Sequence, residues 1–138
     1  MHLQTMMEVK EMNSQKLDNI EALTSKIAFE IVSKIQESKD KTKLKNLIDK
    51  SLGILSNNGI YAYYVFIISQ KEEAIQIFLD ELEEIFNIAK PNDKEYSHQN
   101  REEYFQLLSE NLHKLLFIKQ LLEKTLIYAR YHAKALGD

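Results

Sequence analysis

The sequence predicts an all-α fold: a compact bundle of about five or six helices, one of them a buried hydrophobic central helix, in a single domain over residues 14–138. Turn residues are rare, with three glycines and one proline in 138 residues, whereas a β-sandwich or barrel of this length needs many turn signals. Apolar residues recur at three- and four-residue steps, the period of a helix with one buried face. The 44% hydrophobic and 28% charged content suits a core with a solvated surface.

Two amphipathic helices are predicted in the first half of the chain. The helix at 14–38 carries an aliphatic stripe formed by Leu17, Ile20, Leu23, Ile27, Ile31 and Ile35. The helix at 41–56 carries one formed by Leu44, Leu47, Ile48, Leu52 and Leu55. Residues 1–13 have no such stripe, so we expect a mobile N-terminal tail. Asn58 and Gly59 tolerate left-handed backbone, which predicts a structural turn with positive φ at Gly59.

Three further helical segments are predicted. The apolar, aromatic run at 60–69 has strand propensity, but a lone strand has no partner, so we expect the buried central helix there. A helix at 72–89 points its acidic residues outward and has an inner face of Ile75, Phe78, Leu79, Leu82, Ile85 and Phe86. After a loop at 90–99, residues 101–136 read as one long helix, for which we expect a kink near 119–125 because its length exceeds a small domain. Its inner face is expected to comprise Tyr104, Leu107, Leu108, Leu112, Leu115, Leu116, Leu122, Leu126, Ala129 and Ala133.

Charge is unevenly distributed along the chain, although the net charge is only −3. Residues 61–110 contain eleven acidic and four basic side chains. Residues 34–50 contain six lysines and three acidic residues, and residues 111–138 contain five basic and two acidic residues. An acidic middle between two basic ends permits local contact with nucleic acid by a protein that is not basic overall.

The basic ends supply the candidate nucleic-acid-binding residues, which are Lys39, Lys41, Lys43, Lys45, Lys50, Arg130 and Lys134. Lysine contacts with phosphate add affinity without reading sequence. Around Arg130, Tyr128 and Tyr131 interleave aromatic rings with cations, a combination that suits backbone contact and base stacking. The ordinary alternatives are a solvated, charged helix start for the lysines and core packing for the two tyrosines.

Motifs for catalysis, metal binding and membrane insertion are weak. The absence of cysteine rules out disulfides, thiolate metal sites and a cysteine nucleophile, and fits a reducing cytoplasm. The Glu-x-x-His spacing of di-iron sites occurs at Glu95…His98, in the predicted loop, and at Glu110…His113. There is no Gly-rich phosphate loop or nucleophile elbow. We therefore expect a cytoplasmic protein that is not an enzyme and has no metal or cofactor. The apolar stretch at 51–70 is interrupted at Asn57-Asn58-Gly59, and no signal peptide is visible, so we expect no membrane role.

Three segments resemble a known family. They are Ile27-Ala28-Phe29-Glu30-Ile31-Val32, the stretch 45–69 containing Asn58-Gly59-Ile60, and Thr125-Leu126-Ile127-Tyr128-Ala129-Arg130-Tyr131-His132-Ala133-Lys134-Ala135-Leu136. Together they resemble the small helical subunit (the fifth subunit) of the Cmr complex, the type III-B CRISPR RNA-silencing effector of antiviral defence, over about residues 20–138.

The resemblance implies a non-catalytic structural subunit. Such subunits stack in several copies along the guide RNA–target RNA duplex, contact the backbone subunits of the effector, and leave RNA cleavage to those subunits. The implied partners are the other effector subunits, guide and target RNA through backbone contacts, and further copies of the chain. The competing interpretation is a helical adaptor or regulatory protein that binds another protein through an apolar groove, and a freestanding nucleic-acid binder comes third.

Overall fold

The computed structural model describes the backbone of residues 2–137 and the side chains of residues 19–137. The α-helices are α1 (His2–Glu37), α2 (Lys41–Asn58), α3 (Ile60–Ile68), α4 (Glu72–Phe78), α5 (Glu83–Phe86), α6 (Arg101–Ser109) and α7 (Leu112–Leu136), with 3₁₀ turns η1 (Asp80–Leu82) and η2 (Pro91–Asp93). No strand forms within residues 2–137, so the predicted all-α bundle is confirmed. Seven α-helices are present there because two of the predicted helices are each divided.

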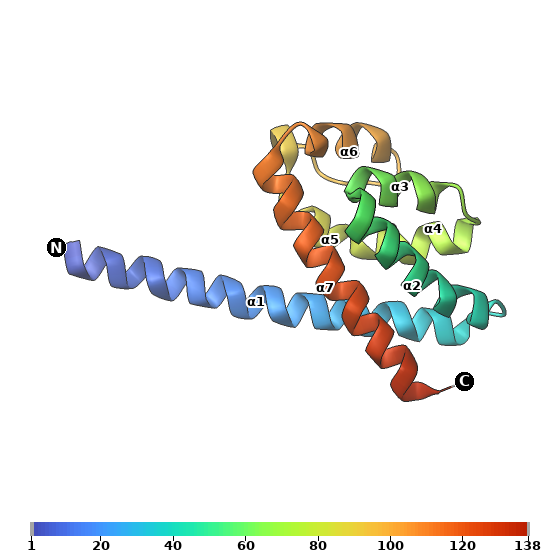
Figure 1. The fold of residues 1–138 in the computed structure, drawn as a ribbon. Coiled ribbons are helices and arrows are strands. Elements are labelled where there is room, and N and C mark those ends of the chain that lie inside the picture. Colours follow the sequence, from blue (N-terminus) through green and yellow to red (C-terminus); the bar gives the residue numbers. More distant parts are fainter. Residues whose placement is uncertain (1, 138) are drawn as a thin grey trace.

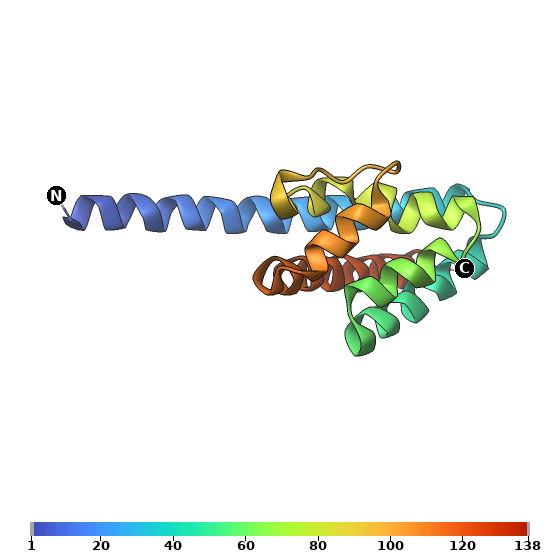
Figure 2. The same ribbon diagram turned by 90° about the horizontal axis from the view of Figure 1, so that it is seen from above.

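The two longest helices, α1 and α7, pack across each other and organise the bundle (Figure 1). Helix α2 packs against α7 and α3 packs against α2, while α4 packs against α1 and α5 packs against α7. The first half of α1 projects beyond the remaining helices, and the end of α7 lies near the start of α2 (Figures 1 and 2). This crossing brings the C-terminal segment of the chain beside the lysine-rich helix α2.

The core follows the predicted apolar faces. From α1 it receives Ile27, Ile31 and Ile35, and from α7 it receives Leu122, Leu126 and Ala129, all essentially inaccessible to solvent. A second part of the core, between α3, α5 and α6, is an aromatic cluster of Tyr64, Phe86, Tyr96, Tyr104 and Phe105. Aromatic rings of this kind bury large apolar areas, so the cluster anchors the end of the bundle opposite the end of α7.

The turn between α2 and α3 is built on Gly59, as predicted. Its φ is 94° and its ψ is 180°, a conformation that L-residues with a side chain rarely adopt. The Gly59 N–H donates to the Leu55 carbonyl at 3.0 Å, and the Gly59 carbonyl accepts from the Tyr63 N–H at 3.1 Å. Asn58 is the last residue of α2. One glycine thus ends one helix and begins the next.

The segment predicted as a buried central helix is helical, but it is buried on one side only. Ile60, Tyr63, Tyr64 and Ile67 are buried, whereas the outer side of α3 exposes Tyr61, Val65 and Ile68. The predicted burial holds for the inner side of α3 and not for its outer side, because α3 packs at the edge of the bundle, mainly against α2, α4 and α6.

The predicted continuous helix at 72–89 is wrong, although its apolar face is buried as expected. The backbone leaves helical geometry at Leu79, with φ −126° and ψ −62°. In a continuous helix the Phe78 carbonyl would accept from the Leu82 N–H, which instead donates to the Leu79 carbonyl at 3.0 Å. The Tyr63 hydroxyl donates to the released Phe78 carbonyl at 2.6 Å. A side chain from another helix therefore satisfies the group that the break exposes.

The last predicted helix breaks at Glu110 and Asn111 and not near 119–125. The Asn111 side chain accepts from the Lys114 N–H at 3.1 Å, an N-cap that starts α7 as a new helix. The new start changes which face of the helix meets the core. Leu112 and Leu116, expected on the inner face, are exposed, with 63% of the Leu112 surface accessible.

The N-terminal boundary also differs from the prediction. The backbone of α1 is helical from His2, twelve residues before the predicted start at residue 14. The side chains of residues 1–18 lie outside the described part of the chain. The mobility expected for residues 1–13 therefore stays a prediction.

Candidate nucleic-acid interface

The end of α7 and the first turns of α2 form a groove of about 340 Å³, here called the basic groove. Its polar lining comprises Thr42, Lys45, Asn46, Asp49, Arg130 and Lys134. Three of the seven predicted contact residues are therefore brought together from two segments that are far apart in the sequence. The helix packing of α2 against α7 produces this arrangement.

Two of the three cations in the basic groove have partners within the chain. The Lys45 ammonium donates to the Gly137 carbonyl at 2.5 Å, which places a positive charge at the carbonyl end of α7, where the helix dipole is negative. The Arg130 Nε lies 3.0 Å from an Asp49 carboxylate oxygen, and both side chains are about half exposed. Among the side chains of residues 19–137, no carboxylate lies within 4.0 Å of the Lys134 ammonium. A phosphate in this groove would meet the Lys134 ammonium and would compete with Gly137 for Lys45 and with Asp49 for Arg130.

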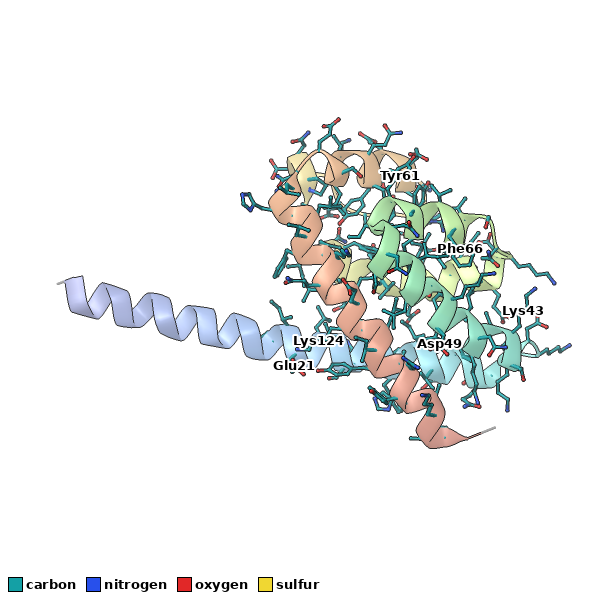
Figure 3. The ribbon with its side chains drawn as sticks, viewed as in Figure 1. Glu21, Lys43, Asp49, Tyr61, Phe66 and Lys124 are labelled. Atoms are coloured by element: carbon teal, nitrogen blue, oxygen red, sulfur yellow. The ribbon has the colours of Figure 1, made fainter. Side chains whose placement is uncertain are left out.

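Of the other predicted lysines, Lys39 is exposed in the turn between α1 and α2, and Lys41, Lys43 and Lys50 divide between the faces of α2. Lys41 lies one turn before Lys45 and so shares its side of the helix. Lys43 lines a separate small hollow between α2 and the start of α4, with Glu73 beside it. In Figure 3, Lys43 points away from α7, whereas Asp49 lies next to α7. The Lys50 ammonium lies 5.5 Å from the centroid of the Phe66 ring, a cation–π contact with α3.

The aromatic residues at the end of α7 have two different roles. The Tyr128 hydroxyl and the Lys124 ammonium both bond the Glu21 carboxylate (Glu21 and Lys124 are labelled in Figure 3), which joins α7 to α1. The hydrogen bond from Lys124, followed by the one from Tyr128, lowers the pKa of Glu21. Tyr128 thus belongs to a contact between helices, as the packing alternative expected. Tyr131 faces solvent, with 64% of its surface accessible.

Sequence reasoning did not single out Phe29. This α1 residue has 60% of its surface accessible, and its ring lies 6.0 Å from the His132 ring of α7, nearly perpendicular to it. The sequence did carry a signal for an exposed aromatic residue, because Phe29 interrupts the polar side of α1 between the buried residues Ala28 and Ile31. Its contact with His132 could not be predicted, since only the crossing of α1 and α7 creates it.

The residues of the two Glu-x-x-His spacings are all exposed. Glu95 and His98 are exposed in the loop before α6, and Glu110 and His113 are exposed around the break before α7. Within residues 19–137 there is no group of three or more His, Cys, Asp or Glu side chains placed to hold a metal ion.

An apolar groove of about 470 Å³ lies where α1 leaves the bundle. It is lined by Asn19, Ile20 and Leu23 of α1, by Ile88 after α5, and by Phe117 of α7. Ile88 and Phe117 are both exposed. This apolar groove is the feature that suits the alternative of an adaptor protein.

No helix in the described part of the chain has both the length and the apolar content that a membrane span requires. Comparison of the chain with protein-family models, with curated proteins and with solved structures gives no match.

Proposed function

We propose that this protein is a non-catalytic structural subunit of a type III-B CRISPR effector complex and that it contacts the RNA backbone through the basic groove. The observation that carries the proposal is the meeting of Lys45, Arg130 and Lys134 in one groove. These residues come from two separate candidate segments, and the Lys45–Gly137 hydrogen bond spans 92 residues of sequence. A cluster of cations that recognises only phosphate suits a subunit that holds RNA of any sequence.

The distribution of charge also supports stacking of several copies. The 25 residues of α7 span about 37 Å at 1.5 Å per residue. The basic groove lies at the C-terminal end of α7, and α6 lies at its other end (Figure 1). There α6 exposes the Glu102 carboxylate, while the Glu103 carboxylate lies 3.4 Å from the Lys94 ammonium. Opposite charges at the two ends of a subunit favour head-to-tail association over association between like ends.

Charge reversal within the basic groove tests the proposal. The double variant Lys45→Glu/Lys134→Glu is expected to weaken binding of a 20-base-pair RNA duplex at low salt by more than tenfold. The slope of log K against log salt should fall by about two, because each phosphate contact on a duplex contributes about 0.9. Fluorescence anisotropy over a salt series measures both quantities.

The matched control is Lys43→Glu/Lys50→Glu, which changes the net charge equally but on the other side of α2. It should leave affinity and salt slope nearly unchanged. Equal losses in the two double variants would show that net charge alone matters, and no loss in either would refute the basic groove. Native mass spectrometry of the tagged protein's endogenous assembly tests the partners. The proposal requires guide RNA and several effector subunits.

A second candidate function is supported by the apolar groove. A helix from another protein that inserted apolar residues against Ile20, Leu23 and Phe117 would make this chain an adaptor. Phe117→Glu would then abolish co-purification of a single protein partner. The same variant should leave RNA retention intact if the chain is an effector subunit that uses the basic groove.

A further inference from the structure

An exposed aromatic patch, consisting of Phe29, Tyr131 and His132, lies on the outer side of α7 near its end. Phe29 and Tyr131 are each more than half accessible, and the rings of Phe29 and His132 lie nearly perpendicular with their centroids 6.0 Å apart. A shallow hollow lined by Tyr128, Tyr131, His132 and Ala135 runs along the same side of the helix. Large aromatic side chains that remain this exposed contribute little to the core.

The aromatic patch adjoins the basic groove. Successive residues of an α-helix are about 100° apart around its axis. Tyr131 therefore lies about 100° from Arg130 and about 60° from Lys134, on the side that leads to His132. Going around α7, the surface passes from the groove cations to Tyr131 and then to His132 and Phe29. Aromatic faces and phosphate-binding cations are thus within reach of a single bound strand.

Resting on the proposed function, we infer that the aromatic patch stacks unpaired bases of a single-stranded RNA segment whose phosphates lie in the basic groove. In a duplex the base faces are covered by neighbouring base pairs, so the exposed aromatic rings could not stack on them. A duplex would therefore interact with this surface only through its phosphates and the nearby cations. A single strand presents free base faces, and stacking on aromatic side chains is tolerant of sequence. The adjacent Arg130 and Lys134 favour a polyanion over an apolar protein surface as the occupant.

The test compares two labelled ligands of equal length and charge on the full chain, a dodecamer of uridine and an abasic dodecamer. Wild-type protein should bind the uridine dodecamer at least about fivefold more tightly, since each stacked base contributes roughly 1–3 kcal/mol. The variant Phe29→Leu/Tyr131→Leu should bind the uridine dodecamer as weakly as the abasic one, while abasic binding stays unchanged. Both residues are exposed, so the thermal midpoint should hardly move.

The matched control is Phe117→Leu, an exposed aromatic residue of α7 outside the patch, which should change neither affinity. Equal wild-type affinities for the two dodecamers, or an unchanged uridine preference in the double variant, overturns the inference while leaving the basic groove in place. If Lys45→Glu/Lys134→Glu binds the abasic dodecamer as well as wild type does, the proposed function fails. The preference of wild type for uridine over the abasic dodecamer still tests the aromatic patch in that case. If wild-type protein binds neither dodecamer, both the proposed function and the inference about the aromatic patch are overturned.

Discussion

The aromatic cluster between α3, α5 and α6 and the aromatic patch at the end of α7 use the same residue types in opposite ways. In the cluster, rings pack within 4.5 to 6.0 Å of one another, and the Tyr104 hydroxyl donates to the Phe86 carbonyl at 2.6 Å. In the patch, Phe29 has one ring contact, and Tyr131 faces water. Burial with a bonded hydroxyl marks an aromatic residue as structural, whereas exposure beside cations marks it as available to a ligand.

The largest expected effect separates the two regions directly. Phe86→Ala empties a fully buried site in contact with Tyr96, Tyr104 and Phe105, and should lower the free energy of unfolding by about 3–5 kcal/mol. Phe29→Ala removes an exposed ring and should change it by less than about 0.5 kcal/mol. Urea denaturation measures both. Similar losses in the two variants would mean that the patch is part of the core.

The second prediction concerns the turn that directs Tyr63 and Tyr64 into the buried region. Gly59→Val forces a β-branched residue into φ 94° and should cost about 1–3 kcal/mol through backbone strain, although no atom blocks the new Cβ. Gly53→Ala, inside α2 and with open space around its Cβ, should instead stabilise by about 0.5–1 kcal/mol. Thermal melting of the two variants checks that Gly59→Val destabilises the protein and Gly53→Ala stabilises it. A Gly59→Val protein as stable as wild type would contradict the turn geometry.

The smallest effect is a pH dependence to which Tyr64 of the buried region contributes. Desolvation, with Glu102 nearby, raises the pKa of Tyr64 from 10.0 to about 12. The folded state therefore keeps the phenol proton that the unfolded state loses, so stability is fully present below pH 10 and falls as pH rises toward about 12. Tyr64→Phe should flatten this fall slightly in urea titrations. Tyr131→Phe in the exposed patch is the control. An equal change in that variant would contradict the assignment of this pH dependence to Tyr64.

Much of the fold could be predicted from local pattern. The apolar faces of α1 and α2 and the turn at Gly59 follow from helical periodicity and from the conformational freedom of glycine. The breaks at Leu79 and Asn111 were misplaced or missed. At Leu79 no glycine or proline marks the break, and the compensating hydrogen bond comes from Tyr63, a residue on another helix. At Asn111 a local N-cap signal was present, but the apolar run on both sides obscured it.

The candidate site was predicted only as separate pieces. The lysines of α2 and the cations of α7 could be named from charge patterning, but not which of them meet. The structure places Lys45 with Arg130 and Lys134 and directs Lys43 and Lys50 elsewhere. Phe29 was missed because its partner His132 is about a hundred residues away in the sequence.

By itself, the sequence determined the class of fold, the buried faces of its helices and the position of its glycine turn, because each depends on residues within a few positions of one another. Tertiary structure alone decided where helices break, which lysines share a groove with the end of α7, and which aromatic rings remain exposed beside them. These features depend on contacts such as Lys45 with Gly137 and Lys124 with Glu21, across 92 and 103 residues. Local propensity carries no information about such contacts, since they form only when whole helices pack.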